Sequence, residues 1–130
     1  MRAVDTNILL RFVVGDDPIQ FEVAARFLKA RTVDDPAYVS LIVLAEMVWA
    51  LDRRYGYPRE SVRAVVLALL ESAEVVFEEE SSLSMLIADQ VKGDIADHLV
   101  ALCARRAGCM SVATFDKKAA RSVPGMELLS

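Results

Sequence analysis

The feature that most constrains the fold is a regular alternation of short apolar segments with longer segments of helical pattern. Short segments at residues 1–4, 37–39, 75–77 and 111–114 are predicted as strands, with a last edge strand at 126–129. Helices are predicted between them and after Asp116, including a seventh short one there. Strand–helix alternation predicts an α/β fold with a mostly parallel central sheet of four or five strands flanked by helices.

The expected helix boundaries follow from caps and breakers. Thr6 is predicted to cap a helix that runs to about residue 14 and ends at Gly15. Helices are also expected over residues 18–30, from Ser40 to about 55, from Pro58 onward, from about 81 to 91, and over 94–107. The helix after Pro58 carries an apolar stripe, formed by Val62, Val65, Val66, Leu69 and Leu70.

Length and composition predict one globular domain over residues 1–130. Hydrophobic residues make up 55% of the chain and charged residues 26%, which excludes a disordered segment. Glu46 interrupts the longest uncharged run, so no membrane span of roughly 18 residues is expected. Asp5 and Arg11 argue against a signal peptide, and a cytoplasmic protein is predicted.

Two further features of composition concern partners and redox state. The mean hydropathy of +0.34 suggests surplus apolar surface that a protein partner would cover. Cys103 and Cys109 are expected to be a reduced, partly buried pair rather than a disulfide. Together with the single His98 they do not have the spacing of a zinc site. The net charge of −4 excludes a nucleic-acid binder that works by overall charge alone.

Four acidic residues stand where an α/β fold places its ligand site. Asp5 and Asp116 directly follow predicted strands, at the carboxyl edge where ligands bind in open parallel sheets. Glu46 is the only charge between residues 36 and 51, and Asp97 lies near the start of an otherwise apolar helix. Carboxylates in apolar surroundings are costly unless they are paired.

A divalent cation would offset this cost. Mg²⁺ and Mn²⁺ favour hard oxygen ligands, and a bound ion activates water for attack on a phosphodiester. Each acid also has a plain structural interpretation: Asp5 and Asp116 as helix caps, Asp97 with Asp94 as favourable charges at a helix N-terminus. Glu46 has the weakest such interpretation, and the four together favour a metal site.

These residues lie in motifs that resemble the PIN-domain family, in particular its VapC toxins. Residues 3–11, Ala-Val-Asp-Thr-Asn-Ile-Leu-Leu-Arg, resemble the opening motif of the family. Residues 39–46 resemble its second acidic motif, residues 94–99 its third, and Val-Ala-Thr-Phe-Asp-Lys at 112–117 its closing motif. The motifs occur in the family's order and span nearly the whole chain. His98 departs from the family, which more often has a small residue there.

The resemblance implies cleavage of RNA by a Mg²⁺- or Mn²⁺-dependent endoribonuclease. It implies that Asp5, Glu46, Asp97 and Asp116 are the acidic ligands. It further implies that Asn7 and Thr114 orient them, with Asp94 as a secondary acid. VapC-like toxins typically form homodimers and are silenced by a cognate antitoxin protein, so both partners are expected here.

Phosphate positioning requires cations near the acids. Arg11 and Lys117 are the candidates because both are near the acidic motifs in sequence. The basic residues from Arg53 and Arg54 to Arg59 and Arg63 are interpreted as a surface face rather than a nucleic-acid track.

Three alternatives remain open. A signalling receiver domain has similar length and element order, but it needs an Asp after its middle strand, and here the second and third strands end near Ser40 and Glu78. A non-catalytic PIN-like binding module would be expected to lack one of the acids. DNA instead of RNA is the third alternative.

Overall fold

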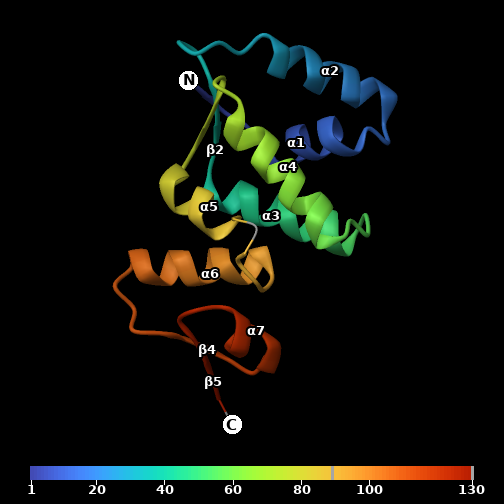
Figure 1. Ribbon diagram of the computed structural model, residues 1–130. Helices are drawn as coiled ribbons and strands as arrows, with labels where there is room; N and C mark the ends of the chain where they lie inside the picture. Colours follow the sequence, from blue (N-terminus) through green and yellow to red (C-terminus); the bar gives the residue numbers. More distant parts are fainter. Residues whose placement is uncertain (89, 130) are drawn as a thin grey trace. The chain divides into compact units, whose positions relative to one another are not determined.

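The computed structural model describes residues 1–88 and 90–129. The chain divides into two compact units, Met1–Ser81 and Ser82–Ser130, and each is described by itself (Figure 1). The expectation of a single domain over the whole chain stays a prediction.

The first unit is built on a three-stranded parallel sheet in the order β1-β2-β3. Its elements are β1 (Arg2–Ala3), α1 (Thr6–Val14), α2 (Pro18–Lys29), β2 (Ala37–Val39), α3 (Leu41–Arg53), α4 (Arg59–Glu71) and β3 (Val75–Phe77). In register, Ala37 of β2 lies opposite Arg2 on one side and Val75 on the other. Because helices connect the parallel strands, all three strand ends reach one edge.

The core of this unit lies between the sheet and its helices. Helices α1 and α2 lie side by side, and α3 contacts both α1 and α4 (Figure 1). The largest side chains that are fully buried here are Leu9, Leu10, Val39, Leu44, Met47, Leu51 and Val66. Each contributes about 1.5–3 kcal/mol relative to an exposed position, so this packing holds α1 against α3.

The second unit contains a two-stranded parallel ladder and three helices. Its elements are α5 (Glu80–Leu86), which begins at the end of the first unit, α6 (Ile95–Arg106), β4 (Val112–Thr114), α7 (Lys117–Ser122) and β5 (Met126–Leu128). Val112 of β4 lies opposite Met126 of β5. His98 of α6 is buried, and its Nε2 lies 2.6 Å from the carbonyl oxygen of Lys92.

Gly93 is required by this arrangement. Its φ is +101°, and an added Cβ would lie 2.9 Å from a methyl group of Val123. A larger residue would therefore displace the segment that leads into α6.

The α/β fold with parallel strands is confirmed. In the described part of the chain all five expected strands form, and every strand pair is parallel, in sheets of three and two strands. Ser40 caps α3 as expected, since its Oγ accepts a hydrogen bond from the backbone N–H of Val43.

Three sequence predictions were wrong in detail. Asp5, not Thr6, caps α1. Helix α5 begins at Glu80 and ends at Leu86 instead of near residue 91, because Ala88 turns back to bond with the carbonyl of Met85. The latter part of that predicted helix includes residue 89, which lies outside the described residues.

The third error concerns the two cysteines, which are free and exposed instead of partly buried. Cys103 lies on the outer side of α6, since Leu99, Ala101 and Leu102 form the buried side of that helix.

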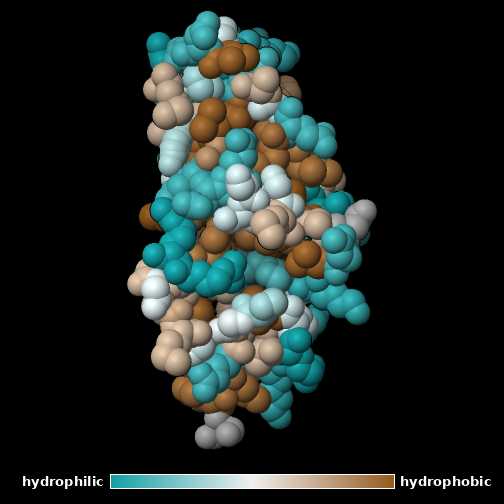
Figure 2. Space-filling model, turned by 60° about the vertical axis from the view of Figure 1, so that its left-hand side comes forward, coloured by the Kyte–Doolittle hydropathy of each residue, from teal (hydrophilic) through white to brown (hydrophobic). Residues whose placement is uncertain are grey.

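Hydrophobic side chains reach the surface in both units, and brown residues are visible on the face in Figure 2. The most exposed large ones include Ile19, Ile42, Met85, Met110 and Phe115. Over the described residues, no helix has the length and apolar character needed to cross a membrane.

Candidate active site

Asp5 follows Val4, the residue after β1, at the carboxyl edge of the three-stranded sheet. It is exposed and serves as the N-cap of α1, where its Oδ1 accepts a hydrogen bond of 2.8 Å from the backbone N–H of Thr6. Capping satisfies one otherwise unpaired helix donor. The cap occupies one carboxylate oxygen, so the second oxygen is available to a ligand.

Glu46 projects from the middle of α3, and its surroundings differ from the prediction. It is exposed, not enclosed by apolar side chains. The buried side of α3 is formed by Leu41, Leu44, Met47, Val48, Ala50 and Leu51. Ile42, Trp49 and Arg53 share the exposed side with Glu46 at helical spacing. Because apolar residues lie on both the buried and the exposed side of α3, the sequence pattern does not show which side faces solvent.

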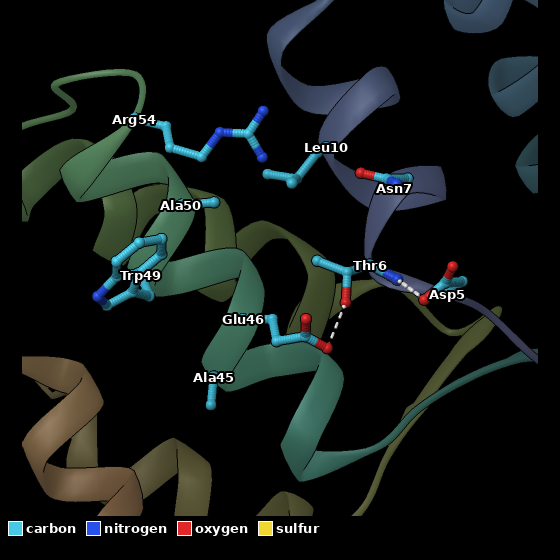
Figure 3. A pocket seen from close by; sticks show the side chains of 9 residues that line it. All are labelled: Asp5, Thr6, Asn7, Leu10, Ala45, Glu46, Trp49, Ala50 and Arg54. Atoms are coloured by element: carbon cyan, nitrogen blue, oxygen red, sulfur yellow. Dashed lines mark hydrogen bonds between the residues drawn. The ribbon is translucent and has the colours of Figure 1, made fainter.

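Thr6 connects these two carboxylates. Its side chain is largely buried, with 7% of the residue exposed, and its Oγ1 donates a hydrogen bond of 3.1 Å to Oε1 of Glu46. Its backbone N–H donates to Asp5 (Figure 3). Sequence reasoning treated Thr6 only as a cap and missed this role, because the partner is 40 residues away.

Asp5 and Glu46 line one cavity of about 550 Å³. The view in Figure 3 shows Thr6 between them and the Arg54 side chain extended toward Leu10. The cavity is lined by Asp5, Thr6, Asn7, Leu10, Ala45, Glu46, Trp49, Ala50 and Arg54. Asn7, predicted to orient the acids, therefore lies in the same cavity as two of them.

Neither acid pairs with a basic group in the part of the chain that the structure describes. Among the described residues, Asp5 and Glu46 take part in no ion pair. Two neighbouring carboxylates without a cation repel each other. Their hard oxygen atoms, exposed to a cavity, fit the donor preference of Mg²⁺ or Mn²⁺.

The cation that lines the cavity is Arg54, which the sequence analysis had assigned to a surface face. Arg11 is one of the two predicted phosphate contacts, and its guanidinium bonds to Gln20 at 2.6 Å and to Tyr55 at 3.4 Å. It also lies 3.7 Å from Asp16. These contacts hold Arg11 against α2 and the end of α3.

The other two acids lie in the second unit. Asp116 is exposed, follows β4 and caps α7 with a 3.0 Å hydrogen bond from Ala119 N–H, and its own N–H donates to Thr114 Oγ1. Asp97 lies in the first turn of α6, after the cap residue Asp94. Thr114 thus contacts Asp116, as an orienting residue would.

The gathering of all four acids at one site stays a prediction. Asp5 and Glu46 belong to one unit, and Asp97 and Asp116 to the other. Within each unit, the described residues contain no group of three His, Cys, Asp or Glu side chains close enough to hold a metal ion. Lys117, the second predicted phosphate contact, is exposed at the start of α7.

The chain is an α/β protein with parallel strands, and acidic residues follow the strands. The PIN domain family model matches residues 2–123, so the chain belongs to the PIN domain family. PIN domains are generally nucleases, which typically use divalent metals. A comparison with curated proteins gives no significant match.

The family match removes the receiver-domain alternative, and the topology agrees. β2 is the middle strand of the three-stranded sheet, and Ser40 follows it. A receiver would need a phosphate-accepting Asp at that place.

Proposed function

We propose that this protein is a Mg²⁺- or Mn²⁺-dependent endoribonuclease that hydrolyses RNA phosphodiesters. The observation that supports it best is the pair of carboxylates, Asp5 and Glu46, that line one cavity, share Thr6 and form no ion pair with any residue that the structure describes. Family membership supports the nuclease class. RNA as the substrate follows from the resemblance of the motifs to VapC toxins.

In this proposal Asp5, Glu46, Asp97 and Asp116 hold the metal. When bound, the ion supplies an activated water and stabilises negative charge on the phosphate. Thr6 fixes the carboxylate of Glu46 through its hydroxyl, and Thr114 fixes the backbone at Asp116. Asn7 and Asp94 remain supporting residues, and Lys117 remains a phosphate contact.

The biological role we propose is that of a VapC-like toxin, paired with an antitoxin protein and active as a homodimer in the cytoplasm. Exposed apolar residues on α2, Ile19 and Val23, support a protein partner. The motif resemblance supports the identity of that partner.

The test is cleavage of a single-stranded RNA and of single-stranded DNA of the same sequence, with Mg²⁺, with Mn²⁺ and with EDTA. We expect RNA cleavage that requires metal. The Asp5→Asn variant should lose cleavage by a factor on the order of 100 or more, as when a preorganised electrostatic group is removed. The fold should persist, because Asn caps a helix as well as Asp does.

A matched control is Asp17→Asn. Asp17 also caps a helix: its Oδ1 accepts a hydrogen bond of 3.0 Å from the backbone N–H of Gln20 in α2, and it does not line the cavity. The Asp17→Asn variant should cleave RNA like the wild-type protein. Full activity of Asp5→Asn, or cleavage that continues in EDTA, would overturn the proposal; preference for DNA would overturn the assigned substrate.

A further inference from the structure

We propose that Trp49 is a stacking platform for an unpaired base, with Arg54 contacting the backbone phosphate of the same strand. The substrate class would then be single-stranded RNA. This inference rests on the proposed function, because it assumes that RNA is cleaved beside Trp49. The binding of RNA to Trp49 can be tested separately from cleavage.

The first support is the position of Trp49 on α3. It lies three residues after Glu46, one helical turn farther along the same side, and both line the cavity (Figure 3). A base stacked on the indole would therefore place its nucleotide next to the acidic pair.

The second support is exposure. Trp49 is 54% exposed, while the helix buries Leu44, Met47 and Leu51 in the core. A single exposed apolar residue is common and needs no explanation. Trp49 differs because it lines a cavity that Asp5, Glu46 and Arg54 also line.

The third support is Arg54, which follows the last turn of α3. Its guanidinium carbon lies 5.5 Å from the centre of the Tyr55 ring, and Tyr55 in turn accepts a bond from Arg11. The planar guanidinium matches the oxygen geometry of phosphate. In a chain of net charge −4, local cations of this kind supply the positive charge near phosphate that the overall charge does not.

An aromatic platform beside a cation is the combination that single-stranded nucleic acids require. Bases of a single strand offer free faces for stacking on aromatic side chains, while the cation contacts the backbone. Bases in a duplex are already stacked on each other. The cavity therefore favours unpaired RNA over a double helix.

The protein itself provides the probe, because Trp49 is its only tryptophan. Its fluorescence is followed while the full-length protein is titrated in EDTA, which suppresses metal-dependent cleavage. Three ligands are compared: a single-stranded RNA, the same backbone with abasic sites, and the duplex form. We expect quenching by the intact single strand and little by the other two.

The binding variants are Trp49→Leu, which keeps an apolar side chain, and Trp49→Phe, which keeps an aromatic ring. Measured by polarisation of a labelled RNA, Trp49→Leu should weaken binding roughly tenfold, in the range found when stacking residues are removed. Trp49→Phe should recover most of it. The control is Ile42→Ala, another exposed apolar residue of α3 that does not line the cavity, and it should bind normally.

In cleavage assays with metal, Trp49→Leu should raise KM by a similar factor with little change in kcat, since stacking is made equally before and during reaction. Arg54→Gln should also raise KM and reduce the salt dependence of binding.

The outcomes separate the two proposals. Quenching without any metal-dependent cleavage would support the base platform and contradict the nuclease proposal. Cleavage that is normal in Trp49→Leu, without quenching by intact RNA, would overturn the platform and leave the nuclease proposal standing. Equal quenching by the abasic strand would also overturn the platform, and so would failure of every nucleic acid to quench.

Discussion

Asp5 and Asp116 occupy equivalent places in the two units, but their neighbours differ. Each follows a strand, and each caps the helix that comes next. Asp5 is connected through Thr6 to a second carboxylate and lines a cavity with it. Asp116 is bonded to the backbone of its own helix, and Thr114 contacts its N–H.

The difference teaches that a cap and a ligand can be the same residue. The cap bond positions the carboxylate at the sheet edge, and a second acid nearby turns that position into a candidate metal site. In the first unit both parts are described. In the second unit only the cap is observed, and binding of the same metal by Asp116 is a proposal that can be tested.

The largest expected effect is that of Asp116→Asn. If Asp116 binds the same metal as Asp5, this variant should lose RNA cleavage by a factor on the order of 100 or more. The double variant with Asp5→Asn should be no worse than either single variant, because groups that act as a unit are not additive. Cleavage rates of the three variants and the wild-type protein check this.

Asp116→Asn should remain folded, because Asn caps a helix as well as Asp does. Circular dichroism checks this. Wild-type activity in Asp116→Asn would show that the two acids do not serve one site. The equivalence of the two units would then be limited to their caps.

A smaller effect is expected from Thr6→Val, which removes the hydroxyl that holds Glu46 and keeps the size of the buried side chain. We expect a loss of about 1 kcal/mol in the free energy of unfolding. Metal affinity should fall roughly 10- to 100-fold, as it does when groups that orient metal ligands are removed. Thr6→Ser, which keeps the hydroxyl, should retain the affinity.

Calorimetric titration with Mn²⁺ and denaturant unfolding without metal separate these two effects. Should Thr6→Val bind metal like the wild-type protein, the bond between Thr6 and Glu46 would be structural only.

Local signals in the sequence predicted most of the fold. The strands at 37–39 and 75–77 were predicted with the observed bounds, and Gly15 ends α1 in the left-handed conformation as expected. These features depend on residues close in sequence. The exposure of the cysteines depends on which side of α6 is buried, and there the prediction was wrong.

The site was predictable in its residue types more than in its contacts. Asp5 and Glu46 were identified from their places after a strand and within an apolar segment, and they do line one cavity. The reason given for Glu46 was wrong, because it is exposed. Thr6 and Arg54 were missed as cavity residues, since helix packing alone brings α1 beside α3.

The smallest effect concerns Asp35, a carboxylate that forms ion pairs with basic groups of the chain. Its carboxylate lies 3.0 Å from the Met1 amino group, 2.9 Å from Arg31 and 3.8 Å from Arg2. The hydrogen bond from the amino group chiefly lowers the pKa of Asp35 below its ordinary value of 3.8; desolvation opposes this, and the positive charges add to the lowering. A lowered pKa gives stability that is present above pH 3.8 and is lost as the pH falls through the folded-state value.

Asp35→Asn should therefore flatten the fall of the melting temperature below about pH 5 and change it only slightly at pH 7, because the pairs are exposed to solvent. It should leave untouched the rise in melting temperature that Mg²⁺ causes by binding the folded state. Asp5→Asn should do the reverse and lose the Mg²⁺ response. If Asp35→Asn removed that response as well, metal binding would reflect general surface charge, and the distinction between acids with cations and acids without them would fail.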